Sequence, residues 1–138
     1  MASTAAKLFK AYMDSKEMNC EFVNDEESVI RAGWKLDNTR ISLYFFFDEE
    51  DNYVHIDGVD FLKVPKDKYD LLLKVVNDCN DNYRWVKFVL DAENEQVVAK
   101  VDAVIQLDSC AEEVYELMVR TAQIVDDSYP KFMKAMWA

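Results

Sequence analysis

The chain contains 138 residues, of which 51% are hydrophobic and 31% charged, a composition typical of a folded protein and too aromatic for a disordered one. This length suits one ordinary domain, so we expect a single domain over residues 1–138. The 16 Lys and Arg against 27 Asp and Glu give a net charge of -11, which argues against nucleic acid or anionic membranes as partners, and no stretch reaches the ~20 apolar residues of a membrane span.

The first part of the chain predicts a helix followed by a three-stranded meander. Ser3-Thr4 is a plausible N-cap, and apolar residues then recur at helical spacing. Strands are predicted at residues 28–36 and 39–47, joined by a turn at Asp37-Asn38. A third strand is predicted at residues 53–61, in which Gly58 marks a bulge.

The second part predicts a helix, a hairpin and another helix. Pro65 begins the second helix, and strands are expected at residues 84–91 and 96–107. Ser109 caps the third helix, with Glu112 three residues later as in a capping box. Tyr129-Pro130 is expected to break this helix, and residues 131–137 to form a separate last turn.

The order α-β-β-β-α-β-β-α resembles the YbjN-like family of small bacterial proteins, which shares the fold of class I type III secretion chaperones. Asn77 and Asn80 at the end of the central helix and Lys87-Phe88-Val89-Leu90-Asp91 in the next strand carry the resemblance, mainly over residues 64–106. Trp85-Val86 departs from it, because a smaller residue, often Gly, is expected there.

The resemblance implies an α+β fold with a five-stranded antiparallel sheet and three helices. It also implies a small acidic protein, frequently a homodimer, that holds another protein and is not an enzyme. A fold alone does not fix a function, so the residues on each face of the sheet carry the rest of the prediction.

Alternation along the strands separates an apolar face from a mixed face. The apolar face, which three helices could cover, contains Ile30, Ala32, Trp34, Leu36, Ile41, Leu43, Phe45, Phe47, Val54, Ile56, Val86, Phe88 and Leu90. The other face contains Tyr44, Phe46, Tyr53, His55, Trp85, Val89 and Val104 together with Arg31, Lys35, Lys87 and Lys100.

The mixed face is predicted to be covered by a second copy of the chain or by a client protein, because several clustered aromatic rings exceed the apolar area that a monomer usually exposes. Two alternatives stay open: a solvated face whose cations pair with Asp57 and Asp102, and a surface for a small ligand. The expected partner or dimer surface comprises Arg31, Tyr44, Phe46, Tyr53, Trp85, Lys87, Met133 and Met136.

Met133 and Met136 belong to a C-terminal segment, with Phe132 and Trp137, whose flexible and aromatic side chains suit varied partners. The competing expectation is that Phe132 and Trp137 fold back and cap the core.

Groups for catalysis or metal binding are sparse. His55 is the only imidazole, and Asp57 faces the same way two residues later, an arrangement more typical of a surface pair than of an acid-base catalyst. Cys20, Cys79 and Cys110 lack metal-site spacing and are expected to be buried thiols. The acidic runs at residues 25–27, 48–51 and 126–127 lack calcium-loop spacing, so we expect no catalytic residue, metal or cofactor.

The sequence therefore predicts a cytoplasmic, non-enzymatic, homodimeric protein-binding module that masks a segment of a client. The alternative is a small-molecule sensor or an enzyme that uses a pocket near His55. Membership of a larger immune or effector assembly is compatible with the sequence but favoured by no residue.

Overall fold

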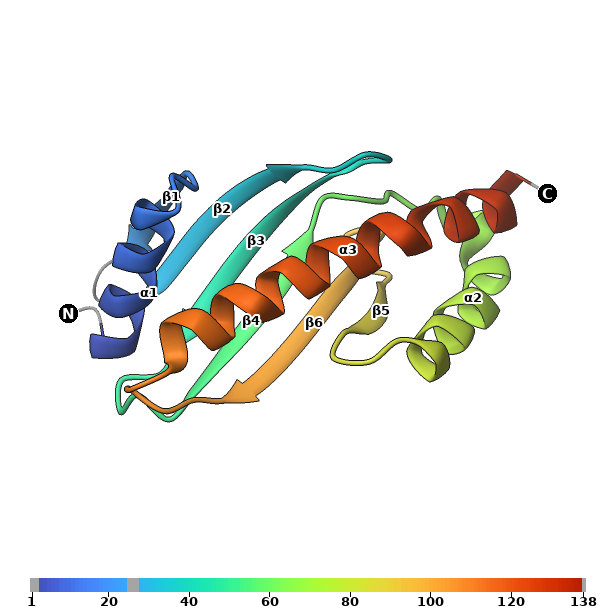
Figure 1. The fold of residues 1–138 in the computed structure, drawn as a ribbon. Coiled ribbons are helices and arrows are strands. Elements are labelled where there is room, and N and C mark those ends of the chain that lie inside the picture. The colour runs from blue at the N-terminus through green and yellow to red at the C-terminus, as the bar shows by residue number, and fades with distance from the viewer. Residues whose placement is uncertain (1–2, 25–27, 138) are drawn as a thin grey trace.

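The computed structural model describes residues 3–24 and 28–137, and Figure 1 shows their arrangement. The order of elements follows the predicted one, with one extra strand after the first helix. The elements are α1 (Thr4–Ser15), β1 (Cys20–Asn24), β2 (Val29–Lys35), β3 (Arg40–Phe47), β4 (Tyr53–Val59), the 3-10 turn η2 (Lys66–Lys68), α2 (Tyr69–Asn82), β5 (Lys87–Asp91), β6 (Gln96–Val104) and α3 (Cys110–Trp137).

The strands form one antiparallel sheet in the order β1-β2-β3-β4-β6-β5, so the described sheet has six strands rather than the predicted five. The additional strand is β1, which pairs with β2 so that Cys20 lies opposite Ala32. None of its five residues is fully buried, which explains why β1 lacks the strong apolar alternation of the central strands.

The core lies between the sheet and α3, which crosses one face of the sheet diagonally while α1 and α2 lie near its two ends (Figure 1). The predicted apolar face is confirmed: Phe45, Ile56 and Phe88 are at most 1% exposed. The rings of Phe88 and Phe132 lie 5.3 Å apart, which places the end of α3 in the core. Within the predicted set, only Trp34, Leu36 and Leu90 are half-buried rather than buried.

The helix α1 begins where the predicted N-cap places it. The hydroxyl of Ser3 accepts a hydrogen bond from the Ala6 N–H at 3.1 Å, so Ser3 is the N-cap. The prediction of a capping box between Ser109 and Glu112 is wrong, because Ser109 donates its hydroxyl hydrogen to Glu113. No hydrogen bond between Ser109 and Glu112 is present in the described chain.

The prediction that Pro130 breaks the third helix is wrong, because α3 continues through Pro130 to Trp137. Proline has no N–H to donate to the carbonyl four residues earlier, which here belongs to Asp126. The Asn38 side-chain amide donates to that carbonyl at 3.0 Å instead. The turn between β2 and β3 therefore supplies the hydrogen bond that the helix lacks.

Gly58 was expected to mark a bulge, and this is also wrong. Gly58 lies in regular register opposite Leu43 on one side and Ala99 on the other. A Cβ atom at this position would lie 2.7 Å from Cδ1 of Ile41, so the glycine provides room for a core side chain.

Candidate functional site

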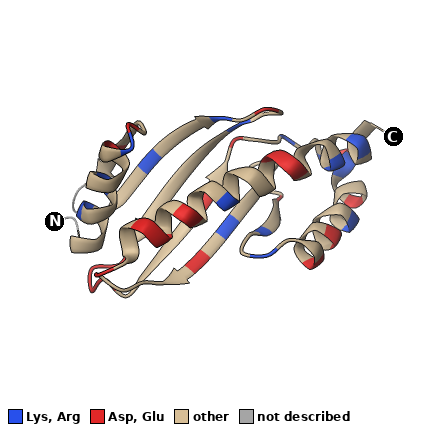
Figure 2. Ribbon diagram, in the orientation of Figure 1, with Lys and Arg blue, Asp and Glu red and all other residues tan. Residues whose placement is uncertain are grey.

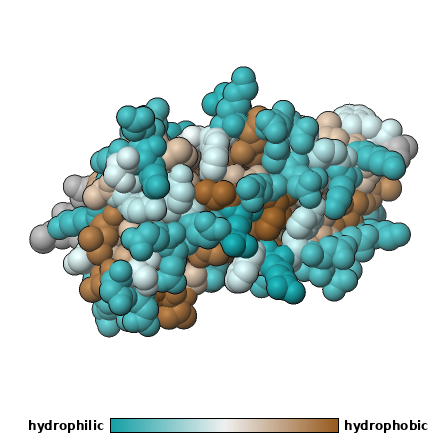
Figure 3. Space-filling view, in the orientation of Figure 1, coloured by the Kyte–Doolittle hydropathy of each residue, from teal (hydrophilic) through white to brown (hydrophobic). Residues whose placement is uncertain are grey.

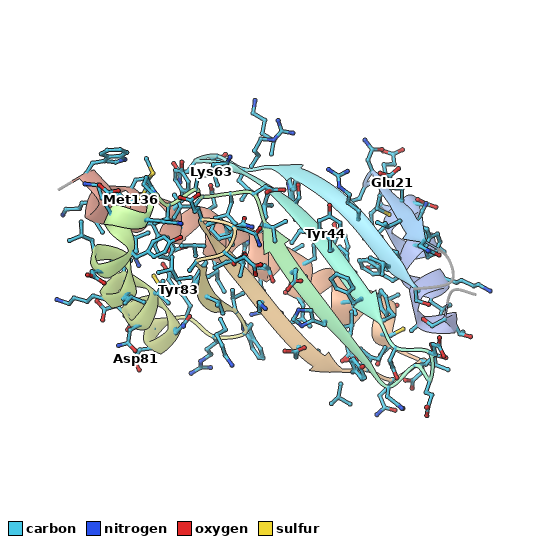
Figure 4. All side chains as sticks on the ribbon, turned by 180° about the vertical axis from the view of Figure 1, so that it is seen from behind. Glu21, Tyr44, Lys63, Asp81, Tyr83 and Met136 are labelled. Carbon is cyan, nitrogen blue, oxygen red and sulfur yellow. The ribbon has the colours of Figure 1, made fainter. Side chains whose placement is uncertain are left out.

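The face of the sheet opposite α3, here called the open face, is the first candidate site. It presents alternate residues of the strands, and the cross-strand register places them in rows. One row runs from Arg31 through Tyr44, Asp57 and Lys100 to Lys87. Figure 4, which shows the molecule from behind, shows Tyr44 on the side of the sheet turned away from α3.

An aromatic group forms the centre of the open face. The rings of Tyr44 and Phe46 are stacked with centroids 6.4 Å apart, and the Phe46 ring lies 5.9 Å from that of His55. Tyr53 lies directly opposite Val104, and these two side chains are 53% and 82% exposed. Apolar and aromatic surface thus spans β3, β4 and β6 on this face, as predicted.

His55 is held between two carboxylates. Its Nδ1 lies 2.6 Å from Oδ1 of Asp102, and its Nε2 lies 2.6 Å from Oδ1 of Asp57. Partial burial by itself would lower the pKa of His55, but the hydrogen bonds to Asp102 and Asp57 and their negative charges outweigh it and leave the pKa raised. The arrangement favours the imidazolium and leaves neither ring nitrogen free to take a proton from a substrate.

The cations of the open face are only partly neutralised. Arg31 lies 3.7 Å from Glu21, whereas neither Lys87 nor Lys100 has a carboxylate within 4.0 Å among the described residues. The alternative in which these cations pair with Asp57 and Asp102 is therefore not observed among the described residues, because both carboxylates bind His55. Lys87 and Lys100 lie opposite each other, an arrangement of like charges that disfavours the bare sheet.

Trp85 was expected beside Tyr44 and Phe46, but the structure separates them. Trp85 precedes β5, with β4 and β6 between it and β3. Its ring lies 5.5 Å from the guanidinium carbon of Arg120 on α3 and lines a groove between β6 and that helix. Its backbone φ of 76° lies in the region that glycine prefers, which explains why a glycine was expected at this position.

The C-terminal methionines also lie away from the open face. Met136 is 3% exposed and belongs to the core, so its assignment to a partner surface is wrong. Met133 is half-buried and lines a small pocket with Tyr129. Phe132 is buried, as the fold-back expectation required, whereas Trp137 is 66% exposed.

The other groups considered for chemistry are the three cysteines and the acidic pair Asp126-Asp127. Cys79 and Cys110 are buried as expected, whereas Cys20 is only half-buried, and burial raises the pKa of all three thiols. Asp126 accepts from the backbone N–H of Asn38, and Asp127 accepts from the hydroxyl of Tyr83.

No cluster of three metal-ligating side chains occurs in residues 3–24 and 28–137, and the acidic run at residues 25–27 lies outside the described residues. Among the described helices, none has the length and apolar character needed to cross a bilayer.

Comparison with known families decides the membership of the chain. The family model of YbjN, described as "Putative bacterial sensory transduction regulator", matches residues 5–133. The chain belongs to the YbjN family. Among curated proteins, none matches this YbjN-family chain.

Solved structures share the fold of the chain at low sequence identity. The crystal structure of YbjN from E. coli aligns with a TM-score of 0.64 at 12% identity, covering 91% of this chain and 92% of that one. A chain of the ExsC-ExsE complex aligns with a TM-score of 0.55 at 14% identity, covering 92% and 96%. The predicted α+β fold, similar to type III secretion chaperones, is confirmed with six strands rather than five.

Proposed function

We propose that this YbjN-family protein is a cytoplasmic, non-enzymatic binding module that acts as a homodimer and masks a segment of a client protein on its open face. The observation that supports this most directly is the aromatic and apolar surface of Tyr44, Phe46, Tyr53 and Val104 on the face of the sheet opposite α3. Burying such side chains against a partner would remove apolar surface from water.

The charges around this surface would position the partner. Lys87 and Lys100 have no ion pair in the described chain, so an acidic side chain of a client could neutralise them at the rim of the contact. Arg31, whose guanidinium lies 3.7 Å from the carboxylate of Glu21, could bind an acidic side chain of the client at the opposite rim of the open face. Apolar side chains would then contact the centre of the face and acidic side chains its rim.

The similarity to a chain of the ExsC-ExsE complex adds support from the fold, because that structure is a complex between two proteins. The catalytic alternative has less support, because His55, the sole imidazole, has both ring nitrogens engaged by carboxylates. A thermal-shift screen against metabolites addresses the sensor alternative, since a tight ligand raises the melting temperature.

The test compares two variants in affinity purification and in mass measurement by light scattering. Tyr44→Ser combined with Phe46→Ser should release the client or convert a dimer to a monomer, while Leu8→Ser, which alters an exposed apolar side chain of α1, should do neither. Both variants should keep the wild-type circular dichroism spectrum. Equal client capture and equal mass for all three proteins would refute the role of the open face.

A further inference from the structure

The last strand of the sheet, β5, covers only part of its neighbour β6. β5 pairs with β6 only from Gln96 to Lys100, so no strand of the described residues pairs with residues 101–104 of β6 on that side (Figure 1). On the other side β6 pairs with β4 as far as Val104. Part of β6, the second strand from the end of the sheet, is thus an edge strand.

The direction of the backbone groups at this edge follows from strand alternation. The N–H groups of Val97 and Ile105 donate to Leu62 and Asn52 on the β4 side, so odd-numbered residues of β6 point towards β4. Asp102 and Val104 therefore point their N–H and C=O groups away from β4. No backbone partner for these groups is present in the described chain.

The outer edge of β5 is protected, in contrast. The side-chain amide of Asn80 accepts from the Phe88 N–H at 2.6 Å and donates to the Phe88 carbonyl at 3.0 Å. Proteins usually cover edges in this way because unpaired backbone groups attract other strands. No described side chain binds the β6 edge in this way, and the edge opens into a groove.

This groove, here called the β6 groove, has a volume of about 470 Å³ and lies between residues 101–105 and α3. Trp85, 57% exposed, and the half-buried Leu117 give it apolar walls, and Val104 lines its outer rim. Figure 3 shows brown, hydrophobic surface near the lower end of the molecule, where β6 ends in Figure 1. The groove therefore offers apolar contacts beside free backbone donors and acceptors.

The charge of the groove is negative. Asp102, Glu113 and Glu116 line it. Asp102 is bound to His55 at 2.6 Å, and Glu116 is paired at 3.0 Å with Arg120, the one cation of the lining, which also lies over Trp85. Figure 2 shows acidic positions in red along the first half of α3 and near the end of β6. The chain as a whole carries a charge of -11, which adds to the attraction for a basic segment.

We propose that the β6 groove binds an extended, basic segment of a partner protein as an added β-strand. The segment would form hydrogen bonds with the backbone of Asp102 and Val104 and place alternate apolar side chains against Trp85 and Leu117. Its basic side chains would alternate with these and point to the open face, where Asp102 lies opposite His55. This inference rests on the proposed protein-binding function but uses the free edge of β6, which adjoins the open face at Asp102 and Val104 and does not include Tyr44 or Phe46.

The test measures binding of a fluorescent synthetic peptide of about eight alternating Val and Lys residues, a typical strand length. Val104→Pro removes the edge N–H without affecting the pairing with β4, whereas Val104→Ala keeps the N–H and serves as the matched control. Trp85→Gly removes the ring at a φ that glycine adopts freely, so the fold should survive. Thermal melts verify folding of each variant.

We expect the peptide to bind the wild type and Val104→Ala alike, and at least ~10-fold more weakly to Val104→Pro and Trp85→Gly. A peptide of alternating Val and Glu should not bind. Among peptides N-methylated at either the Val or the Lys amides, only one should lose affinity, because alternate N–H groups of a strand face opposite edges. Binding to Tyr44→Ser combined with Phe46→Ser should be unchanged.

Several outcomes would overturn the proposal. These are absence of peptide binding at millimolar concentration, equal binding to Val104→Pro, and equal binding of both methylated peptides. Loss of binding only in the Tyr44 and Phe46 variant would assign the peptide to the open face, which rejects the groove and leaves the proposed function standing. A wild-type dimer that Val104→Pro converts to a monomer would show that a second copy occupies the edge instead.

Discussion

The side-chain amide of Asn38 donates a hydrogen bond to the carbonyl oxygen of Asp126 at 3.0 Å, replacing the bond that Pro130 cannot make within α3. The backbone N–H of Asn38 also donates to the carboxylate of the same aspartate at 2.7 Å. The hairpin turn between β2 and β3 is thereby attached to the middle of α3.

This relationship predicts a coupling between two distant substitutions. Asn38→Ala should lower the free energy of unfolding by about 0.5 to 1.5 kcal/mol, the usual net value of one hydrogen bond. Pro130→Ala should restore the helical bond to Asp126, so Asn38→Ala should cost less in that background. Urea denaturation of both single variants and the double variant measures the coupling, and strictly additive effects would contradict it.

The sequence predicted most of the fold because periodicity and turn residues report local structure. It failed at Pro130 because the compensating donor, Asn38, is 88 residues away in the chain from the acceptor Asp126, and no local pattern records this contact. It missed β1 because this five-residue strand lies at the sheet edge and contains no buried residue. The first error concerns a contact between distant parts of the chain, and the second concerns a strand too exposed to show apolar alternation.

The sequence predicted the part of the candidate site that lies on regular strands and missed the part that depends on loops and strand ends. Alternation placed Tyr44, Phe46 and Tyr53 correctly on one face, because the register of β3 and β4 is regular. The position of Trp85 depends on a loop with a positive φ, which side-chain alternation does not report. The free edge of β6 depends on where β5 begins, and strand lengths are poorly determined by sequence patterns.

We expect substitutions of two asparagines of α2, Asn77 and Asn80, to differ in their effect on stability, although the sequence pattern does not distinguish them. Asn80→Ala should remove both hydrogen bonds to the backbone of Phe88. Because Phe88 is buried, its unpaired N–H and C=O groups should lower the free energy of unfolding by about 1 to 3 kcal/mol. Asn77→Ala, at an exposed position of the same helix, should change it by less than ~0.5 kcal/mol. Urea denaturation measures both, and equal effects would argue against the role of Asn80 at the β5 edge.

We expect a side chain at position 58 to clash with Ile41, and a smaller residue at position 41 to relieve the clash. In Gly58→Ala the new methyl group would lie 2.7 Å from Cδ1 of Ile41, so the buried isoleucine must move at a cost of about 1 to 3 kcal/mol. Ile41→Val lacks the Cδ1 atom. The double variant should therefore lose less stability in thermal or urea unfolding than the sum of the single variants, and a loss equal to the sum would show that Ile41 is not the obstacle.

His55 predicts a pH dependence of stability with a defined sign. Because the pKa of His55 is raised in the folded protein above the 6.5 of an unperturbed histidine, its bonds to Asp57 and Asp102 stabilise the fold fully below pH 6.5, and this stabilisation is lost as the pH rises through the folded pKa. Relative to His55→Gln, the wild type should therefore lose stability to urea as the pH increases over this window. NMR titration of the imidazole gives the folded pKa directly. A folded value at or below 6.5, or an identical pH profile for His55→Gln, would mean that the two carboxylates do not hold the imidazolium.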